Sequence, residues 1–118
     1  MNVLIIHRQP SFLQSVKEKF LLGGWQVTTS NNGLDGLLTA RHHRFDLVLC
    51  GIDLPVVSGT EVIRSIRMLS QNRHTPVFFI STDDKESFSR LKLIAQLEAN
   101  VMNEKEIAES RKFTWLDN

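Results

Sequence analysis

Residues 45–67 have the sequence FDLVLCGIDLPVVSGTEVIRSIR, and this stretch decides the fold. Its first part, Asp46–Cys50, is a short run of mostly apolar residues, which predicts a strand buried on both faces of a parallel sheet. Residues 51–59 contain a proline and two glycines, and therefore predict a long loop of the kind that carries function. Apolar residues recur at helical spacing over 60–69, which predicts a helix with Thr60 as its N-cap.

The same alternation of strands and helices continues on both sides of this stretch. Further strands are expected at residues 3–6, 25–29, 76–80 and 99–102, and further helices at about 10–22, 34–41, 88–97 and 104–113. Strands and helices in this order predict a parallel sheet covered by helices, with right-handed crossovers. Five such units in 118 residues predict one α/β domain over residues 1–118, a flavodoxin-like doubly wound sheet with strand order 2-1-3-4-5.

The composition is that of an ordinary soluble globular protein, with 42% hydrophobic and 23% charged residues. Lys and Arg number 14 against 13 Asp and Glu, so the net charge of +1 gives no support for nucleic-acid binding. No apolar stretch approaches the roughly 18 residues of a membrane span, and no signal peptide precedes the first strand, so a cytoplasmic location is expected. The single cysteine, Cys50, lies in an apolar run and is expected to be a buried, inert thiol.

In a sheet of this strand order, the ligand site lies at the carboxyl ends of the first and third strands, where the strand order reverses. The residues that end these strands and the neighbouring fourth strand are His7, Arg8, Gly51, Ile52, Asp53, Ser81 and Thr82. These residues are therefore the candidates for the functional site.

Over about residues 2–111 the sequence resembles the receiver domain of bacterial two-component response regulators. The resemblance is most specific in 45–67, where Leu-Pro is followed by Ser-Gly and by a helix containing Ile-Arg. It implies the CheY-like form of the fold and a role in phosphorelay signal transduction. In such receivers an aspartate at the end of the third strand accepts the phosphoryl group, while an acidic pair after the first strand helps to hold Mg²⁺. A Ser or Thr ends the fourth strand, and a lysine follows the fifth.

This chain departs from the family pattern at several of those positions. The resemblance aligns Gly51 with the phospho-accepting aspartate, and His7 and Arg8 with the acidic pair. Ser81 matches the hydroxyl position, and Lys105 is the candidate for the lysine. Because glycine cannot form an acyl phosphate and Mg²⁺ needs oxygen ligands, we expect Mg²⁺ binding to be lost and no cofactor to be bound.

The leading hypothesis is a pseudo-receiver that acts through phosphorylation-independent protein binding and is not an enzyme. One alternative is an active receiver phosphorylated at Asp53, two residues beyond the usual acceptor position. A less favoured alternative is a flavodoxin-like binder of a small ligand. Arg8 either pairs with Asp53, Asp83 or Asp84, or binds an external anion together with His7, Ser81 and Lys105.

By family analogy, the partner face comprises the fourth helix, the fifth strand and the fifth helix. Its candidate residues are Phe88, Lys92, Val101 and Lys105. The expected partner is a histidine kinase, a downstream effector or a second copy of the chain, and neither nucleic acid nor membrane is expected.

The second helix predicted from the sequence has an apolar side and a basic end. Leu34, Leu37, Leu38 and Arg41 share one face. A basic cluster, Arg41–Arg44, follows at the carboxyl end, where cations are favoured by the helix dipole. Adjacent histidines point to different faces of a helix, so His42 and His43 do not form a chelating pair.

Overall fold

The computed structural model describes residues 1–82 and 88–109, which form a parallel sheet of five strands in the order β2-β1-β3-β4-β5. The strands are β1 (Asn2–Ile6), β2 (Gln26–Ser30), β3 (Leu47–Gly51), β4 (Val77–Ser81) and β5 (Asn100–Asn103). The helices are α1 (Pro10–Leu22), α2 (Gly33–His42), α3 (Gly59–Leu69), α4 (Phe88–Gln96) and α5 (Glu104–Glu109). The predicted fold class and strand order are confirmed. No helix in these two ranges is both long enough and apolar enough to cross a membrane.

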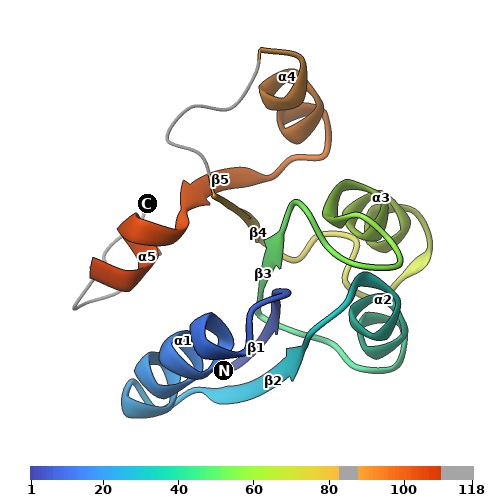
Figure 1. Ribbon diagram of the computed structural model, residues 1–118. Helices are drawn as coiled ribbons and strands as arrows, with labels where there is room; N and C mark the ends of the chain where they lie inside the picture. The colour runs from blue at the N-terminus through green and yellow to red at the C-terminus, as the bar shows by residue number, and fades with distance from the viewer. Residues whose placement is uncertain (83–87, 110–118) are drawn as a thin grey trace.

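Helices cover both faces of the sheet, with α1 and α5 on one side and α2, α3 and α4 on the other (Figure 1). Successive side chains of a strand point to opposite faces, so β1 contributes to both cores. Val3 and Ile5 pack on the α1 and α5 side, whereas Leu4 and Ile6 pack on the α2 and α3 side. This two-sided burial explains why β1 and β3 are continuous apolar runs in the sequence.

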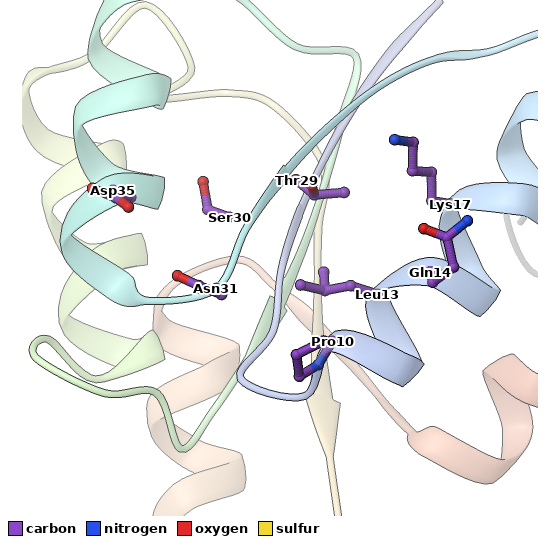
Figure 2. A pocket seen from close by; sticks show the side chains of 8 residues that line it. All are labelled: Pro10, Leu13, Gln14, Lys17, Thr29, Ser30, Asn31 and Asp35. Carbon is purple, nitrogen blue, oxygen red and sulfur yellow. The ribbon is translucent and has the colours of Figure 1, made fainter.

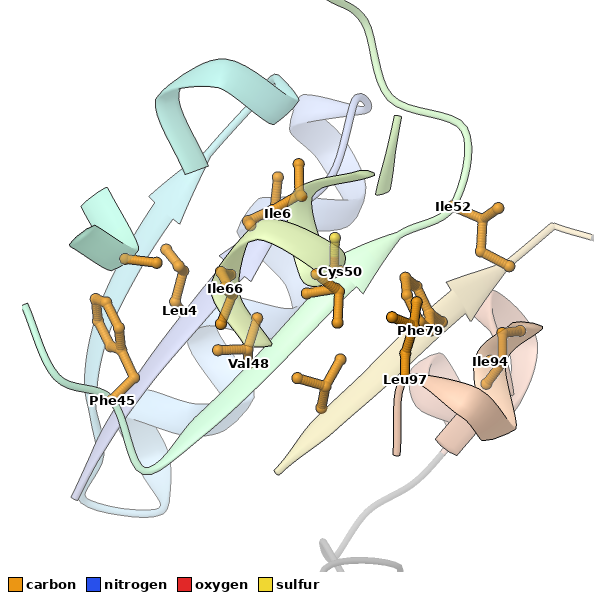
Figure 3. Close-up of a cluster of buried hydrophobic side chains, with 14 residues drawn as sticks. Leu4, Ile6, Phe45, Val48, Cys50, Ile52, Ile66, Phe79, Ile94 and Leu97 are labelled. Atoms are coloured by element: carbon orange, nitrogen blue, oxygen red, sulfur yellow. The ribbon is translucent and has the colours of Figure 1, made fainter. Parts of the chain in front are cut away.

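The core between the sheet and helices α2, α3 and α4 contains Cys50, as Figure 3 shows. Cys50 is fully buried there, and burial raises the pKa of its thiol far above the usual range. A thiol that stays protonated is a poor nucleophile. The expectation of a buried, inert Cys50 is therefore confirmed.

The buried residues of helix α2 are small, namely Gly33, Gly36 and Ala40. A Cβ atom added to Gly36 would lie only 2.5 Å from Cδ1 of Ile6, so α2 approaches β1 too closely for a larger side chain. Leu34 and Leu38 are exposed, and Leu37 is half-buried against the core. The face shared by the leucines is thus only partly a core face.

Helix α3 begins directly above the carboxyl end of β3. Its N-cap is Ser58, whose Oγ accepts a hydrogen bond from the Glu61 N–H at 3.4 Å, so the prediction of Thr60 as the cap is wrong by two residues. The Gly59 N–H donates to the Ile52 carbonyl at 2.9 Å. A Cβ atom on Gly59 would lie 1.9 Å from the Gly51 carbonyl oxygen, so only glycine fits at this contact.

Candidate functional site

The carboxyl end of β3 is closed by neighbouring side chains. Gly51 is buried, and a Cβ atom added to it would lie 3.1 Å from Cδ2 of Leu54 and 3.5 Å from Cδ2 of His7. The Leu54 side chain and the His7 ring thus lie beside the position that a side chain at residue 51 would occupy.

His7 is held in one orientation by hydrogen bonds to both ring nitrogens. Its Nδ1 accepts a hydrogen bond from the Gln9 N–H at 3.0 Å, and its Nε2 lies 2.8 Å from Oε1 of Glu104. Because Nδ1 is an acceptor, the hydrogen-bond network assigns the proton of the neutral ring to Nε2, which donates to the Glu104 carboxylate. The Phe12 ring packs against the imidazole, with the two centroids 4.3 Å apart.

The buried environment keeps His7 neutral near pH 7. Only 3% of the residue is exposed, and this burial lowers the pKa of the imidazole, although the Glu104 carboxylate opposes the shift. The His7–Glu104 contact is thus a hydrogen bond from a neutral ring to a carboxylate. It joins the segment after β1 to the start of α5, which are 97 positions apart in the chain.

One alternative predicted an ion pair between Arg8 and Asp53, and the structure does not contain it. Oδ1 of Asp53 instead lies 3.9 Å from a guanidinium nitrogen of Arg90 in α4, and both side chains are exposed. An exposed pair at this distance contributes little stability. Arg8 is exposed, and no carboxylate of residues 1–82 or 88–109 lies within ion-pair distance of it. The alternative partners Asp83 and Asp84 lie outside the described residues.

The residues after β4 and β5 complete this edge of the sheet. Ser81 is buried at the end of β4 and is in register with Asn103 of β5. Lys105 is exposed on α5, and the residue that contacts the site from this side is Glu104. The sequence analysis missed Glu104, although its position directly after a strand, at the carboxyl edge, is a signal that could have identified it.

Comparison with known families matches residues 3–114 to the response regulator receiver domain. The chain belongs to this family. Among curated relatives, the polar-differentiation response regulator DivK of Brucella anthropi is 32% identical over 80 residues, which are 68% of this chain and 65% of that protein. The probable transcriptional regulatory protein TcrX of Mycobacterium tuberculosis is 30% identical over 84 residues, but the match covers only 35% of that protein. The receiver domain thus spans about one to two thirds of these relatives.

Solved structures of other receivers share the fold at low sequence identity. The chemotaxis protein CheY4 of Vibrio cholerae superposes with a TM-score of 0.81 at 24% identity, covering 98% of this chain and 95% of that one. The receiver domain of the sensor histidine kinase PA1611 of Pseudomonas aeruginosa has a TM-score of 0.78 at 21% identity, with coverage of 98% and 90%. That structure is described as having a magnesium ion in its active-site cleft.

In residues 1–82 and 88–109, the side chains at the corresponding edge do not fit a magnesium ion. Mg²⁺ requires oxygen ligands in near-octahedral geometry, with carboxylates as the usual protein contribution. Position 51 has no side chain, the Glu104 carboxylate accepts from His7, and Asp53 lies beside Arg90. In the described ranges, no group of three or more His, Cys, Asp or Glu side chains is arranged to hold a metal ion.

A cavity of about 410 Å³ lies beside the site, between α1 and the carboxyl end of β2 (Figure 2). It is lined by Pro10, Leu13, Gln14, Lys17, Thr29, Ser30, Asn31 and Asp35. Figure 2 shows Gln14 and Lys17 on the α1 side and Asn31 and Asp35 on the opposite side. These residues include no aromatic ring on which a flavin or a base could stack, so the cavity gives no support to a flavodoxin-like ligand.

The predicted partner face contains a second depression, of about 490 Å³, between α4 and β5. It is lined by Phe78, Leu91, Ile94, Ala95, Ala99, Asn100, Val101, Met102 and Glu106. Val101 is half-buried within it, and Leu91 is 42% exposed at its border. Lys92 and Lys105 are exposed on the adjoining helices, whereas the Phe88 side chain lies outside the described residues.

Proposed function

We propose that this receiver domain transmits its signal through protein binding, without accepting a phosphoryl group and without acting as an enzyme. The observation that carries the proposal is the closed end of β3. Gly51 offers no nucleophile, and the His7 ring lies beside it, with its Nε2 hydrogen-bonded to Glu104.

The chemistry of phosphoryl transfer explains why this arrangement favours a silent site. An acyl phosphate needs a carboxylate nucleophile, and its formation needs positive charge to neutralise the transferred oxygens. The position after β1 holds a neutral histidine, and the position that meets it after β5 holds a carboxylate. Glu104 would repel a phosphoryl group and would offer no substitute for the lysine of the family.

The His7–Glu104 hydrogen bond also favours one fixed arrangement of this edge. A part-buried side-chain contact joins the segment after β1 to the segment after β5. We infer a domain that rests permanently in one conformation, to which partners bind directly.

The face over α4, β5 and α5 is the proposed binding surface, with Lys92, Val101 and Lys105 as contact residues. Its depression is lined by both apolar and polar residues, as is usual for non-obligate protein interfaces taken as a whole. A histidine kinase, a downstream effector or a second copy of this chain is the proposed partner, in a cytoplasmic signalling pathway.

Self-association provides the first test of this face. We expect sedimentation velocity to show concentration-dependent association of the wild-type protein, unchanged by acetyl phosphate and Mg²⁺. The double variant Lys92→Glu/Lys105→Glu should weaken it, whereas Lys17→Glu/Arg64→Glu, with the same change in net charge on other faces, should not. Equal association of both variants would contradict the proposal that this face mediates binding. A monomeric wild-type protein would exclude a second copy of the chain as the partner.

Phosphorylation at Asp53 is the competing function, because this carboxylate is exposed and lies near a guanidinium group. It predicts that Mg²⁺ binds beside Asp53. In an amide NMR titration, an active site would show saturable Mg²⁺-dependent shifts around residues 51–53. A silent site should show only small, linear shifts, and Asp53→Asn should leave them unchanged.

A further inference from the structure

The opposite edge of the sheet carries a patch of basic side chains that the signalling face does not use. It consists of the end of α2 with the segment before β3, and of the loop between α3 and β4. We call it the amino-edge patch, and its residues are Arg41, His42, His43, Arg44, Arg73 and His74, all of them exposed. A helix dipole favours cations only within the last helical turn, so it does not explain the arginine and histidine of the second loop.

A buried asparagine fixes the two basic segments to each other. Asn72 is fully buried, and its Nδ2 donates to the carbonyl oxygens of Ala40 and His43 at 2.6 and 2.7 Å. Its Oδ1 accepts from the Phe45 N–H at 2.7 Å and from the Thr75 hydroxyl at 3.1 Å. The backbone that carries the patch is therefore preorganised, which lowers the entropic cost of binding a partner there.

The charges of the patch are not neutralised within the described part of the chain. There, no carboxylate lies within ion-pair distance of Arg41, Arg44 or Arg73. The nearby acid, Asp46, accepts a hydrogen bond from the Asn2 N–H at 2.7 Å. Uncompensated arginines on a rigid surface favour a partner that supplies planar anions such as carboxylates.

The surface around the patch is hollowed on both sides of Arg44. One cavity, of about 500 Å³, is lined by Arg44 together with Arg73 and His74. The other, of about 750 Å³, is lined by Arg44 together with His42 and His43. Each cavity is large enough to receive individual side chains of a bound segment.

We propose that the amino-edge patch docks an acidic segment of a partner protein, with glutamate or aspartate side chains entering the two cavities. This interaction is separate from the function proposed above and does not depend on it. A nucleic acid fits the surface less well, because the chain has a net charge of +1 and lacks the strongly basic balance of proteins that bind nucleic acids.

Fluorescence anisotropy with a labelled octaglutamate peptide tests the proposal, using the whole 118-residue chain. We expect saturable binding at low ionic strength that weakens as salt is added. The double variant Arg44→Gln/Arg73→Gln should weaken binding by about fivefold or more, because two charge-assisted contacts are lost. The double variant Arg64→Gln/Lys92→Gln has the same net charge but leaves the patch intact, so it should change binding less than about twofold.

Three results would overturn the proposal. The first is the absence of saturable peptide binding by the wild-type protein, and the second is an equal loss in both double variants. The third is tighter binding of a labelled single- or double-stranded oligonucleotide than of the peptide, with the same sensitivity to Arg44→Gln/Arg73→Gln. That last result would assign the patch to nucleic acid instead.

Discussion

The two edges of this sheet differ in what their polar residues do. At the carboxyl edge, where the family carries out its chemistry, His7 and Glu104 form a part-buried hydrogen bond. At the amino edge, Asn72 makes four side-chain hydrogen bonds, and three of them hold the loop between α3 and β4 to the segment that runs from the end of α2 to β3. The fold therefore does not depend on the catalytic residues of the family, because its polar anchor lies at the other end of the strands.

Removing the anchor of the amino edge should have the largest effect. Asn72→Ala removes the partner of the Phe45 N–H, of the buried Ala40 carbonyl and of the part-buried His43 carbonyl, so we expect a loss of about 3 kcal/mol in the free energy of unfolding. Urea unfolding measures this loss. The neighbouring Gln71→Ala removes only an exposed contact at 3.4 Å and should cost less than about 0.5 kcal/mol. Similar losses in the two variants would contradict the anchoring role.

A pair of glycines tests how tightly the carboxyl edge is packed. In Gly59→Ala the new methyl group would overlap the Gly51 carbonyl oxygen at 1.9 Å, so α3 must move at a cost of about 2 kcal/mol. In Gly51→Ala the nearest atom is the flexible end of Leu54 at 3.1 Å, and the cost should stay below about 1 kcal/mol. Urea unfolding of both variants checks the order, and the reverse order would show that the edge is packed differently.

The buried histidine should make stability depend on pH at the carboxyl edge. The pKa of His7 lies below 6.5 in the folded protein, so the unfolded chain binds the proton first as the pH falls. The contribution of His7 to the free energy of unfolding is therefore complete above about pH 6.5 and is lost on acidification below it.

Urea unfolding from pH 7.5 to 5 measures this contribution. His7→Gln should flatten the profile relative to wild type, whereas His74→Gln, which removes an exposed histidine at the amino edge, is the matched control. Parallel profiles of wild type and His7→Gln would contradict a buried, neutral imidazole.

The smallest expected effects concern backbone strain, which is present at both edges. Val56 has φ of 72° in the loop after β3, and Glu98 has φ of 55° just before β5. Glycine adopts this conformation without a steric penalty, so Val56→Gly and Glu98→Gly should each raise the free energy of unfolding by about 0.5–1 kcal/mol. Thermal unfolding checks both changes. A loss of stability in either variant would mean that its side chain makes a contact that outweighs the strain.

Much of the fold could be predicted from local sequence. The apolar runs at 3–6, 46–50 and 76–80 are continuous because these strands are covered on both faces, and this pattern leaves little choice of structure. The predicted strand and helix boundaries differ from the observed ones by only one or two residues in most elements. The helix predicted over 104–113 can be compared only as far as Glu109, since the residues from 110 onward lie outside the described ranges.

The site could be predicted only in part, because its decisive contacts join residues that are distant in sequence. The carboxyl-edge rule placed His7, Gly51 and Ser81 together, but nothing in the sequence pairs His7 with Glu104. Asparagine is a residue type that is typical of exposed loops, and only the tertiary structure shows that Asn72 is buried. Likewise, the glycine of α2 that contacts Ile6 cannot be distinguished from a weak helix position by its local pattern.

The most direct test of the silent carboxyl edge is the intact mass of the protein after incubation with Mg²⁺ and acetyl phosphate. A receiver domain with the acidic pair and the acceptor aspartate serves as the positive control in the same reaction. We predict that this chain gains no phosphoryl adduct while the control does. A stoichiometric adduct that disappears in Asp53→Asn would contradict the account and would identify Asp53 as a working acceptor.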